Sequence, residues 1–356
     1  MDSCVITRAL LTEHYKRYPQ MQISDIFKFI FQSSFGCEHM VASEELAINN
    51  IKREYAEMIT ERALLVEKLD GDYSRVDLSY LDKGLSAEAL GKLFCLSANI
   101  ERDGAEKLAK KLMAARSLVS EGVLPFALED FEKELSRWSS DGYPAVHHSD
   151  SFRKAYKPAY RVIANKYTVF LPLFAEIDKR LAVGEVVLAI DGGSASGKTT
   201  LSKLLENIYD CNVFHMDDFF LRPEQRSAER LLEVGGNVDR ERFFEEVLLP
   251  TSRRETVSYR RFDCSTQALL EPKTVEPKRL TVVEGAYSMH KELAPYFDLS
   301  VFLDISEDHQ KERVLERNGA ALAKRFFEEW IPLENIYFSN TDIRSRCTLS
   351  VKIEKN

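Results

Sequence analysis

The chain has 356 residues, of which 44% are hydrophobic and 30% charged, a composition typical of globular proteins and not of disordered or membrane-embedded chains. Its formal net charge of −8 argues against nucleic acid or an anionic membrane as a general partner. No apolar run approaches the ~20 residues that cross a bilayer, the charged N-terminal segment does not predict a signal peptide, and six scattered cysteines without a CxxC pair are typical of free thiols in a reducing, cytoplasmic compartment.

The first part of the chain has the pattern of amphipathic helices. Apolar residues recur at spacings of three and four in "ISDIFKFIFQSSF", "SEELAINNIKREYAEMI" and "AEKLAKKLMAARSLVSEG". Ser24 and Ser43 stand where a hydroxyl can cap the free N–H groups of a first turn. Since no strand is predicted before Val186, we expect an all-α domain over residues 1–182.

Two stretches of this helical part contain side chains that occur in ligand sites. Cys37 and His39, in "SSFGCEHM", are of a type that binds zinc, although structural zinc sites usually have paired ligands at close spacing. His147, His148 and Arg153, in "DGYPAVHHSDSFRKAYKPAYRVI", are of a type that binds phosphate or carboxylate. The alternatives are a packed helix end for the first stretch and exposed basic side chains that need no ligand for the second.

From residue 183 onward, short apolar runs alternate with helical or loop segments. The runs are "EVVLAID", "CNVFHMD", "RLTVVEG", "LSVFLDI" and "CTLSVKI". Runs of this length suit strands buried on both faces, and their alternation with helices suits a parallel sheet. We therefore predict an α/β domain over residues 183–356, with a five-stranded parallel sheet flanked by helices, joined to the helical domain by a helix that ends near Gly184.

The loop after the first of these runs matches the pattern GxxxxGK[ST]. It reads Gly192, Gly193, Ser194, Ala195, Ser196, Gly197, Lys198 and Thr199, followed by Thr200. Glycines let backbone N–H groups point at phosphate oxygens, and the following helix adds its positive N-terminal end. Lys198 can reach the β- and γ-phosphates of a nucleotide, and the Thr199 hydroxyl can bind Mg²⁺. The pattern predicts a nucleoside triphosphate site, and the alternative is a glycine-rich turn with a solvated lysine.

Carboxylates follow the second and third runs. Asp217 and Asp218 come after Met216, at the sheet edge where α/β proteins bind ligands. A carboxylate there can accept the proton of an attacking hydroxyl or bind Mg²⁺ through water, whereas an arbitrary pair of aspartates is more often a solvated turn. Glu284 is followed by Gly285, where motor-type nucleotidases have Asp-Glu. The sequence therefore favours a carboxylate on the metal side, and transfer over hydrolysis.

Five segments in this order, "AIDGGSASGKTTLSKLL", "MDDFF", "SYRRFD", "VVEGAYS" and "ERVLERNG", resemble the uridine kinase and phosphoribulokinase family of P-loop kinases. The resemblance covers about half of the chain, from Gly184 onward. It implies ATP and Mg²⁺ as cofactors. It also implies that Asp217 is the catalytic base, and that Glu284 holds Mg²⁺ together with Thr199.

The same resemblance implies a lid that closes over the phosphates. Arg313 and Arg317 are four residues apart and so on one helical face. They are similar to the lid arginines that act with the loop lysine, here Lys198, on the transferred phosphoryl group. Arg325 either joins them or is a solvated surface residue.

The resemblance implies an acceptor site as well. Tyr259 stands where the family has an aromatic substrate contact, with Arg260 and Arg261 beside it. Asp239, in "GGNVDRERF", lies in a segment that is similar to part of the acceptor site. Uridine kinases follow the tyrosine segment with a His and an Arg that contact the nucleoside, whereas this chain reads "FDCSTQALLEP". The implied function is therefore transfer of the ATP γ-phosphate to a hydroxyl of a small molecule, with the nucleoside not implied.

The first 182 residues lie outside the resemblance, and neither their role nor a homo-oligomeric state follows from the sequence. One alternative function is a nucleotide-binding sensor in which the helical domain binds a ligand or partner. The presence of Asp217, Glu284 and the two lid arginines counts against a pure sensor, because binding alone needs no base and no lid. A second enzymatic activity in the helical domain is the other alternative.

Overall fold

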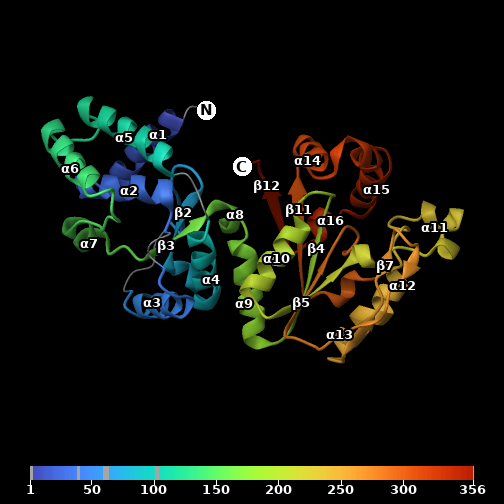
Figure 1. Ribbon diagram of the computed structural model, residues 1–356. Coiled ribbons are helices and arrows are strands. Elements are labelled where there is room, and N and C mark those ends of the chain that lie inside the picture. The colour runs from blue at the N-terminus through green and yellow to red at the C-terminus, as the bar shows by residue number, and fades with distance from the viewer. Residues whose placement is uncertain (1–2, 38–40, 59–63, 101–103, 356) are drawn as a thin grey trace. The chain divides into compact units, whose positions relative to one another are not determined.

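The structure, a computed structural model, describes residues 3–37, 41–58, 64–100 and 104–355. The chain forms two compact units, Met1–Ala175 and Glu176–Asn356 (Figure 1). The division between the units falls inside helix α9 (Leu171–Val183). The sequence had predicted the boundary at residues 182 and 183, near the end of this helix.

The N-terminal unit consists mainly of helices, as predicted. They are α1 (Ser3–Arg17), α2 (Ile23–Phe35), α3 (Glu44–Ala56), η2 (Leu78–Lys83), α4 (Ala87–Ala98), α5 (Gly104–Ser120), α6 (Leu128–Ser140), α7 (Asp150–Tyr156) and α8 (Asn165–Thr168). Aromatic side chains join α2 to α6: the ring of Phe27 stacks on Trp138 at 4.9 Å and meets Phe131 edge-on at 5.3 Å. Such pairs stabilise a core beyond the area that they bury.

This unit also contains a three-stranded antiparallel sheet, which corrects the prediction of an all-α domain. Its strands are β1 (Val66–Lys68), β2 (Tyr73–Asp77) and β3 (Tyr160–Ala164), in the order β1-β2-β3. All five residues of β2 are buried, so polar and apolar side chains do not alternate as they do in a strand with one face in water. Its partner β3 is far along the chain, and a local pattern therefore did not reveal either strand.

The C-terminal unit is built on the predicted five-stranded parallel sheet. The strands are β4 (Val186–Gly192), β5 (Cys211–His215), β10 (Leu280–Glu284), β11 (Leu299–Ile305) and β12 (Leu349–Ile353). Their order is β12-β11-β4-β10-β5, and every neighbouring pair is parallel. All five strands were predicted from the sequence, and the α/β prediction is confirmed.

Helices and short hairpins connect these strands (Figure 1). The helical elements are α10 (Lys198–Ile208), η3 (Met216–Phe219), η4 (Pro223–Gln225), α11 (Ala228–Leu232), α12 (Arg240–Phe243), η5 (Phe244–Leu248), α13 (Leu249–Ser252), η6 (Ala294–Tyr296), α14 (Glu307–Arg325), η7 (Phe326–Trp330), α15 (Ile331–Thr341) and α16 (Ile343–Arg346). Strands β6 (Val257–Tyr259) and β9 (Lys273–Val275) form one antiparallel pair, and β7 (Phe262–Asp263) and β8 (Ala268–Leu269) form another.

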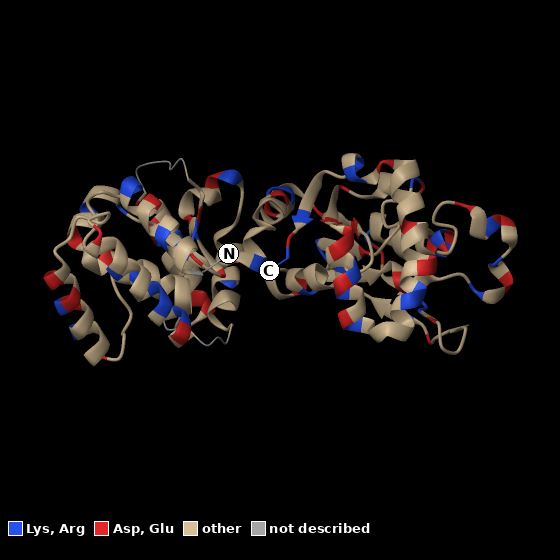
Figure 2. Cartoon of the chain, turned by 90° about the horizontal axis from the view of Figure 1, so that it is seen from above, with Lys and Arg blue, Asp and Glu red and all other residues tan. Residues whose placement is uncertain are grey.

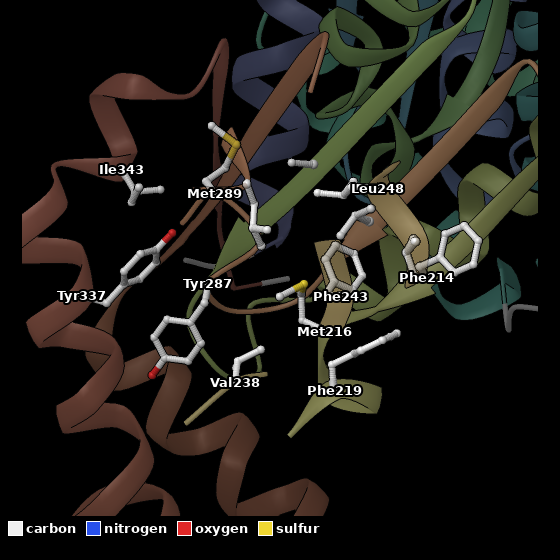
Figure 3. Packing of buried hydrophobic residues seen from close by; sticks show 14 of the residues in the cluster. Phe214, Met216, Phe219, Val238, Phe243, Leu248, Tyr287, Met289, Tyr337 and Ile343 are labelled. Carbon is white, nitrogen blue, oxygen red and sulfur yellow. The ribbon is translucent and has the colours of Figure 1, made fainter. Parts of the chain in front are cut away.

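One hydrophobic cluster fixes the segments that follow the strands. It contains Met216 and Phe219 after β5, Tyr287 after β10, and Tyr337 of α15 (Figure 3). The rings of Tyr287 and Tyr337 lie 4.9 Å apart. Because the carboxyl ends of parallel strands share one sheet edge, this cluster holds the loops at that edge in place.

Positively and negatively charged residues are mixed along both units: Lys and Arg are interspersed with Asp and Glu (Figure 2). Among the described residues, no helix is both long enough and apolar enough to cross a bilayer. The six cysteines are free thiols, as predicted.

Candidate active site

The phosphate-loop pattern forms a tight turn between β4 and α10. The Ser196 N–H donates to the Gly193 carbonyl oxygen (3.1 Å). Gly192 has φ = +146° and Gly197 has φ = +101°, a region that residues with a Cβ rarely adopt. A Cβ at Gly192 would also lie 2.6 Å from the carbonyl oxygen of Leu303 in β11. Two glycines of the pattern are therefore required by the local fold.

Two basic side chains bind the loop through its carbonyl groups. Lys198 Nζ donates to the carbonyl oxygens of Gly192 (2.8 Å) and Gly193 (3.0 Å). Arg313, from α14, donates through Nη1 to the carbonyl oxygen of Ala195 (3.2 Å). The predicted loop lysine and one predicted lid arginine thus contact carbonyl groups of the same loop.

A carboxylate meets the loop at the end of β10. Thr199 Oγ1 donates to Glu284 Oε1 (3.0 Å), and His215 Nδ1 lies 2.6 Å from the same oxygen. Burial alone would raise the pKa of Glu284, but the hydrogen bond from His215 and the charge of Lys198 outweigh it and hold that pKa below its usual value. Ionised Glu284 and the Thr199 hydroxyl offer oxygen ligands of the kind that Mg²⁺ prefers.

His215 was not among the residues predicted for the site. Its hydrogen bond to Glu284 raises the pKa of His215, while burial opposes the rise. The available signal was a histidine near the end of an apolar run, two residues before Asp217. Its partner was not visible, because β5 and β10 become neighbours only in the folded sheet.

Asp217 and Asp218 lie in η3, directly after β5. Although Asp217 as a residue is exposed, the protein around its carboxylate raises its pKa by desolvation, and the charges of Lys198 and Arg317 work in the opposite direction. Asp218 Oδ1 lies 3.9 Å from Nε of Arg261. Asp217 is thus the acid whose pKa the charges of Lys198 and Arg317 lower.

Two of the predicted acceptor residues make contacts within the protein, although Arg260 is itself exposed. Tyr259 is buried, and its ring packs 5.4 Å from the ring of Phe214. The Arg260 guanidinium donates to the carbonyl oxygens of Leu269 (3.0 Å) and Leu270 (2.6 Å). These contacts hold the two hairpins in place, so the structure gives both side chains a role in the fold.

The other two predicted acceptor residues differ in exposure. Asp239 is buried and caps helix α12, accepting the N–H of Arg242 (3.2 Å) and Nε2 of Gln225 (2.9 Å). Arg261 is exposed beside Asp218. Of the four, Arg261 is the one whose guanidinium is at the surface next to the aspartate pair.

The lid arginines lie on α14, and Gly319 interrupts that helix with φ = +68°. The Arg317 guanidinium lies over the ring of Phe326, 5.5 Å from its centroid, and it forms no ion pair within the described part of the chain. Arg325 is exposed and pairs with a neighbouring glutamate (3.1 Å). Arg317 and Arg325 are both exposed, and the charge of Arg317 acts on the Asp217 carboxylate.

The side chains proposed as a second ligand site differ in exposure. His147 and Arg153 are exposed, whereas His148 is buried. His148 Nδ1 lies 2.8 Å from Asp25 Oδ1, and its Nε2 lies 2.7 Å from the Tyr160 hydroxyl. Neutral His148 satisfies both contacts by donating to Asp25 and accepting from Tyr160. The buried histidine therefore joins α2 to β3.

Acid is expected to weaken the N-terminal unit through this histidine. Burial lowers the pKa of His148 to about 4, although the hydrogen bond to Asp25 opposes the shift. In the unfolded chain a histidine has a pKa near 6.5, so neutral His148 makes its full contribution to the free energy of unfolding above that pH. It should fall by about 3 kcal/mol as the pH drops to 4. The measurement is urea unfolding followed by Trp138 fluorescence in a Trp330→Phe background, where Trp138 is the remaining tryptophan.

Two variants separate this histidine from other acid effects. His148→Gln keeps a donor and an acceptor but cannot be protonated, so its stability should depend less steeply on pH between 6.5 and 4. His147→Gln changes an exposed side chain and should follow the parent. Equal slopes for the parent and His148→Gln would contradict the prediction.

The first predicted ligand stretch contains a core thiol. Cys37 is buried, with Sγ 3.5 Å from the carbonyl oxygen of Val162, and burial raises its pKa to about 12. His39 lies outside the described residues. Within the ranges that the structure describes, no three His, Cys, Asp or Glu side chains are placed to hold a metal ion.

The parallel sheet and the phosphate loop after β4 give the C-terminal unit an α/β P-loop fold, and helix α14 contacts that loop through Arg313. No family model matches the chain. A uridine kinase from Chlamydia pneumoniae is 28% identical over 142 residues, which cover 37% of this chain and 62% of that relative. The predicted resemblance of the C-terminal half to the uridine kinase family is thereby confirmed.

Solved structures with similar folds are more distant. A possible uridine kinase from Bacillus stearothermophilus is 22% identical, with a TM-score of 0.38 over 48% of this chain and 89% of its own. Shikimate kinase from Aquifex aeolicus is 19% identical, with a TM-score of 0.25 over 48% of this chain and 87% of its own. Each match leaves about half of this chain without a counterpart.

Proposed function

We propose that the C-terminal unit is an ATP- and Mg²⁺-dependent kinase that phosphorylates a hydroxyl group of a small molecule. The observation that supports this most is the Thr199–Glu284 contact (3.0 Å) at the sheet edge where Asp217 also lies. Loops of this pattern bind nucleotide phosphates, hydroxyl and carboxylate oxygens suit Mg²⁺, and a carboxylate nearby suits proton abstraction.

Each side chain has a role in the proposed transfer. Lys198 and the N–H groups of the loop hold the β- and γ-phosphates, and Thr199 with Glu284 would hold Mg²⁺, which neutralises phosphate charge when bound. Asp217 accepts the proton of the acceptor hydroxyl. Arg317, without an ion pair in the described structure, offers its charge to the phosphoryl group. Positioning and charge supply most of the rate in such transfers.

A nucleotide-binding sensor is the second candidate. The uridine kinase match covers only 37% of this chain, and the N-terminal unit has a core of its own. In this alternative, the N-terminal unit binds a ligand or partner, and nucleotide binding to the C-terminal unit is coupled to that event.

The deciding experiment is an ATP-consumption screen with Mg²⁺ over nucleosides, sugars, sugar phosphates, polyols and hydroxy acids. ADP release and product mass are read together, and Lys198→Ala serves as the control for a contaminating kinase. We expect one acceptor class to gain a phosphate with wild type and not with the control.

ADP release without any phosphorylated product would overturn the transfer proposal. No turnover, combined with tight nucleotide binding, would favour the sensor. The absence of nucleotide binding would overturn both candidates.

A further inference from the structure

The N–H groups of the phosphate loop fall into two sets. Those of Gly192, Ser194 and Ser196 donate within the protein, to Asp191 Oδ1 (2.7 Å), Glu334 Oε2 (2.8 Å) and a loop carbonyl (3.1 Å). By contrast, none of the hydrogen bonds of the described residues uses the N–H of Ala195 or Gly197. The N–H groups of Gly192, Ser194 and Ser196 are thus held by the protein, and those of Ala195 and Gly197 are left for a ligand.

Glu334 of α15 supplies the contact at the middle of the loop. Its residue exposure is 5%. Its two carboxylate oxygens accept both donors of Ser194, the backbone N–H (2.8 Å) and the hydroxyl (2.6 Å). Gln310 of α14 donates from Nε2 to the carbonyl oxygen of Ser194 (2.9 Å). Every polar group of Ser194 is therefore bound by a side chain of α14 or α15.

A second contact from α15 supports the start of the loop. Tyr337 is three residues after Glu334 and so on the same helical face. Its hydroxyl donates to Oδ2 of buried Asp191 (2.8 Å), which also accepts the N–H of Met289 (2.9 Å). One face of α15 thus contacts the loop on both sides of Gly192.

Packing at this place is close. A Cβ on Gly193 would lie 2.8 Å from Nε2 of Gln310 and 3.6 Å from Oε2 of Glu334. The two side chains leave no room for the loop to move toward α14 and α15. Because a hydrogen bond to a charged group is among the stronger ones in proteins, the carboxylate restrains Ser194 more than a neutral group would.

We propose that Glu334 is a positioning residue of the nucleotide site: by binding both donors of Ser194, it holds the phosphate loop in the conformation whose free N–H groups receive the phosphates. The inference rests on the proposed function only in its nucleotide-binding part. No acceptor substrate enters it.

The contact between Glu334 and Ser194 could also act in the opposite direction, by weakening nucleotide binding. A carboxylate on a phosphate-binding loop is itself an anion, so it competes with the nucleotide if the Ser194 donors are meant for phosphate. Removing a competitor tightens nucleotide binding, whereas removing a support weakens it. The sign of the change in affinity separates the two.

The test is calorimetric measurement of the Kd for MgATP in the full chain. Glu334→Ala is expected to weaken binding by about 10- to 100-fold, the usual effect of losing hydrogen bonds to a charged group. Glu334→Gln keeps the size and one acceptor oxygen and should recover part of this loss. Glu328→Gln removes an exposed carboxylate from the preceding helical segment and should leave the Kd unchanged.

A double-mutant cycle distinguishes positioning from general destabilisation. Ser194→Ala removes the hydroxyl donor and keeps the N–H, so it should weaken binding by about threefold in wild type. In the Glu334→Ala background it should have no effect, because the partner is already gone. If Glu334→Ala does not fold, the same cycle is run with Glu334→Gln, where Ser194→Ala should have a reduced effect.

Unchanged or tighter MgATP binding in the Glu334 variants would overturn the inference, and so would an equal effect of Ser194→Ala in both backgrounds. If wild type itself does not bind MgATP, the proposed function fails and the inference with it. If wild type binds and the variants bind equally well, the inference alone fails.

Discussion

Replacing Asp217 with asparagine is expected to lower the rate of phosphoryl transfer by about 10²- to 10⁴-fold, the usual contribution of a general base. The amide keeps the size of the side chain but cannot take a proton. Asp217 is chosen over Asp218 because the charges of Lys198 and Arg317 act on its carboxylate. Transfer is measured as single turnover with the acceptor found in the screen, and the Kd for MgATP is measured alongside.

Asp218→Asn is the matched control. Asp218 differs from Asp217 in its surroundings, since it faces Arg261 at 3.9 Å. We expect this variant to lose less than tenfold in rate and to bind MgATP as wild type does. A larger loss with Asp218→Asn than with Asp217→Asn would exchange the roles of the two aspartates.

The second large effect is expected from Gly192→Ala. A Cβ there would lie 2.6 Å from the Leu303 carbonyl oxygen, on a backbone with φ = +146°, and such strain costs about 1–3 kcal/mol. Since 1 kcal/mol shifts the Tm of a unit of this size by ~2–4 °C, the C-terminal unit should melt several degrees lower. The displaced loop should also bind MgATP more than about tenfold more weakly, as its N–H groups no longer converge.

Gly184→Ala is the control for this substitution. Gly184 has open space where a Cβ would be placed and lies outside the phosphate loop, so its melting temperature and MgATP affinity should match wild type. Unfolding of the C-terminal unit is followed by Trp330 fluorescence in a Trp138→Phe background. Wild-type nucleotide affinity in Gly192→Ala would mean that the loop tolerates a side chain at this position.

The sheet and the phosphate loop were predictable because their signals are local. Each of the five strands is a short apolar run between turns, and Gly192 to Thr199 match one contiguous pattern. The roles of Glu334 and His215 were not predictable in this way. Glu334 lies 140 residues from Ser194, and His215 meets Glu284 through strand pairing.

The acceptor site shows a different limit. Tyr259, Arg260 and Asp239 were assigned to it because they resemble a family pattern, and the structure gives all three contacts inside the protein. A family motif predicts which residues lie near a site, but burial and internal hydrogen bonds decide which of their polar groups can contact a ligand. Arg260 and Arg261 are both exposed, but the guanidinium of Arg260 donates to backbone carbonyl oxygens, whereas that of Arg261 lies beside Asp218.

The two hydrogen bonds of Lys198 to Gly192 and Gly193 have a consequence for how tightly the loop holds a nucleotide. The Lys198 ammonium group already donates hydrogen bonds to two carbonyl oxygens. A phosphate that binds there would therefore replace these acceptors. The affinity then reflects the difference between two sets of hydrogen bonds and not the full strength of one. If the proposed function holds, the lysine returns to these carbonyl groups when the nucleotide leaves, so that the loop keeps its conformation between one nucleotide and the next.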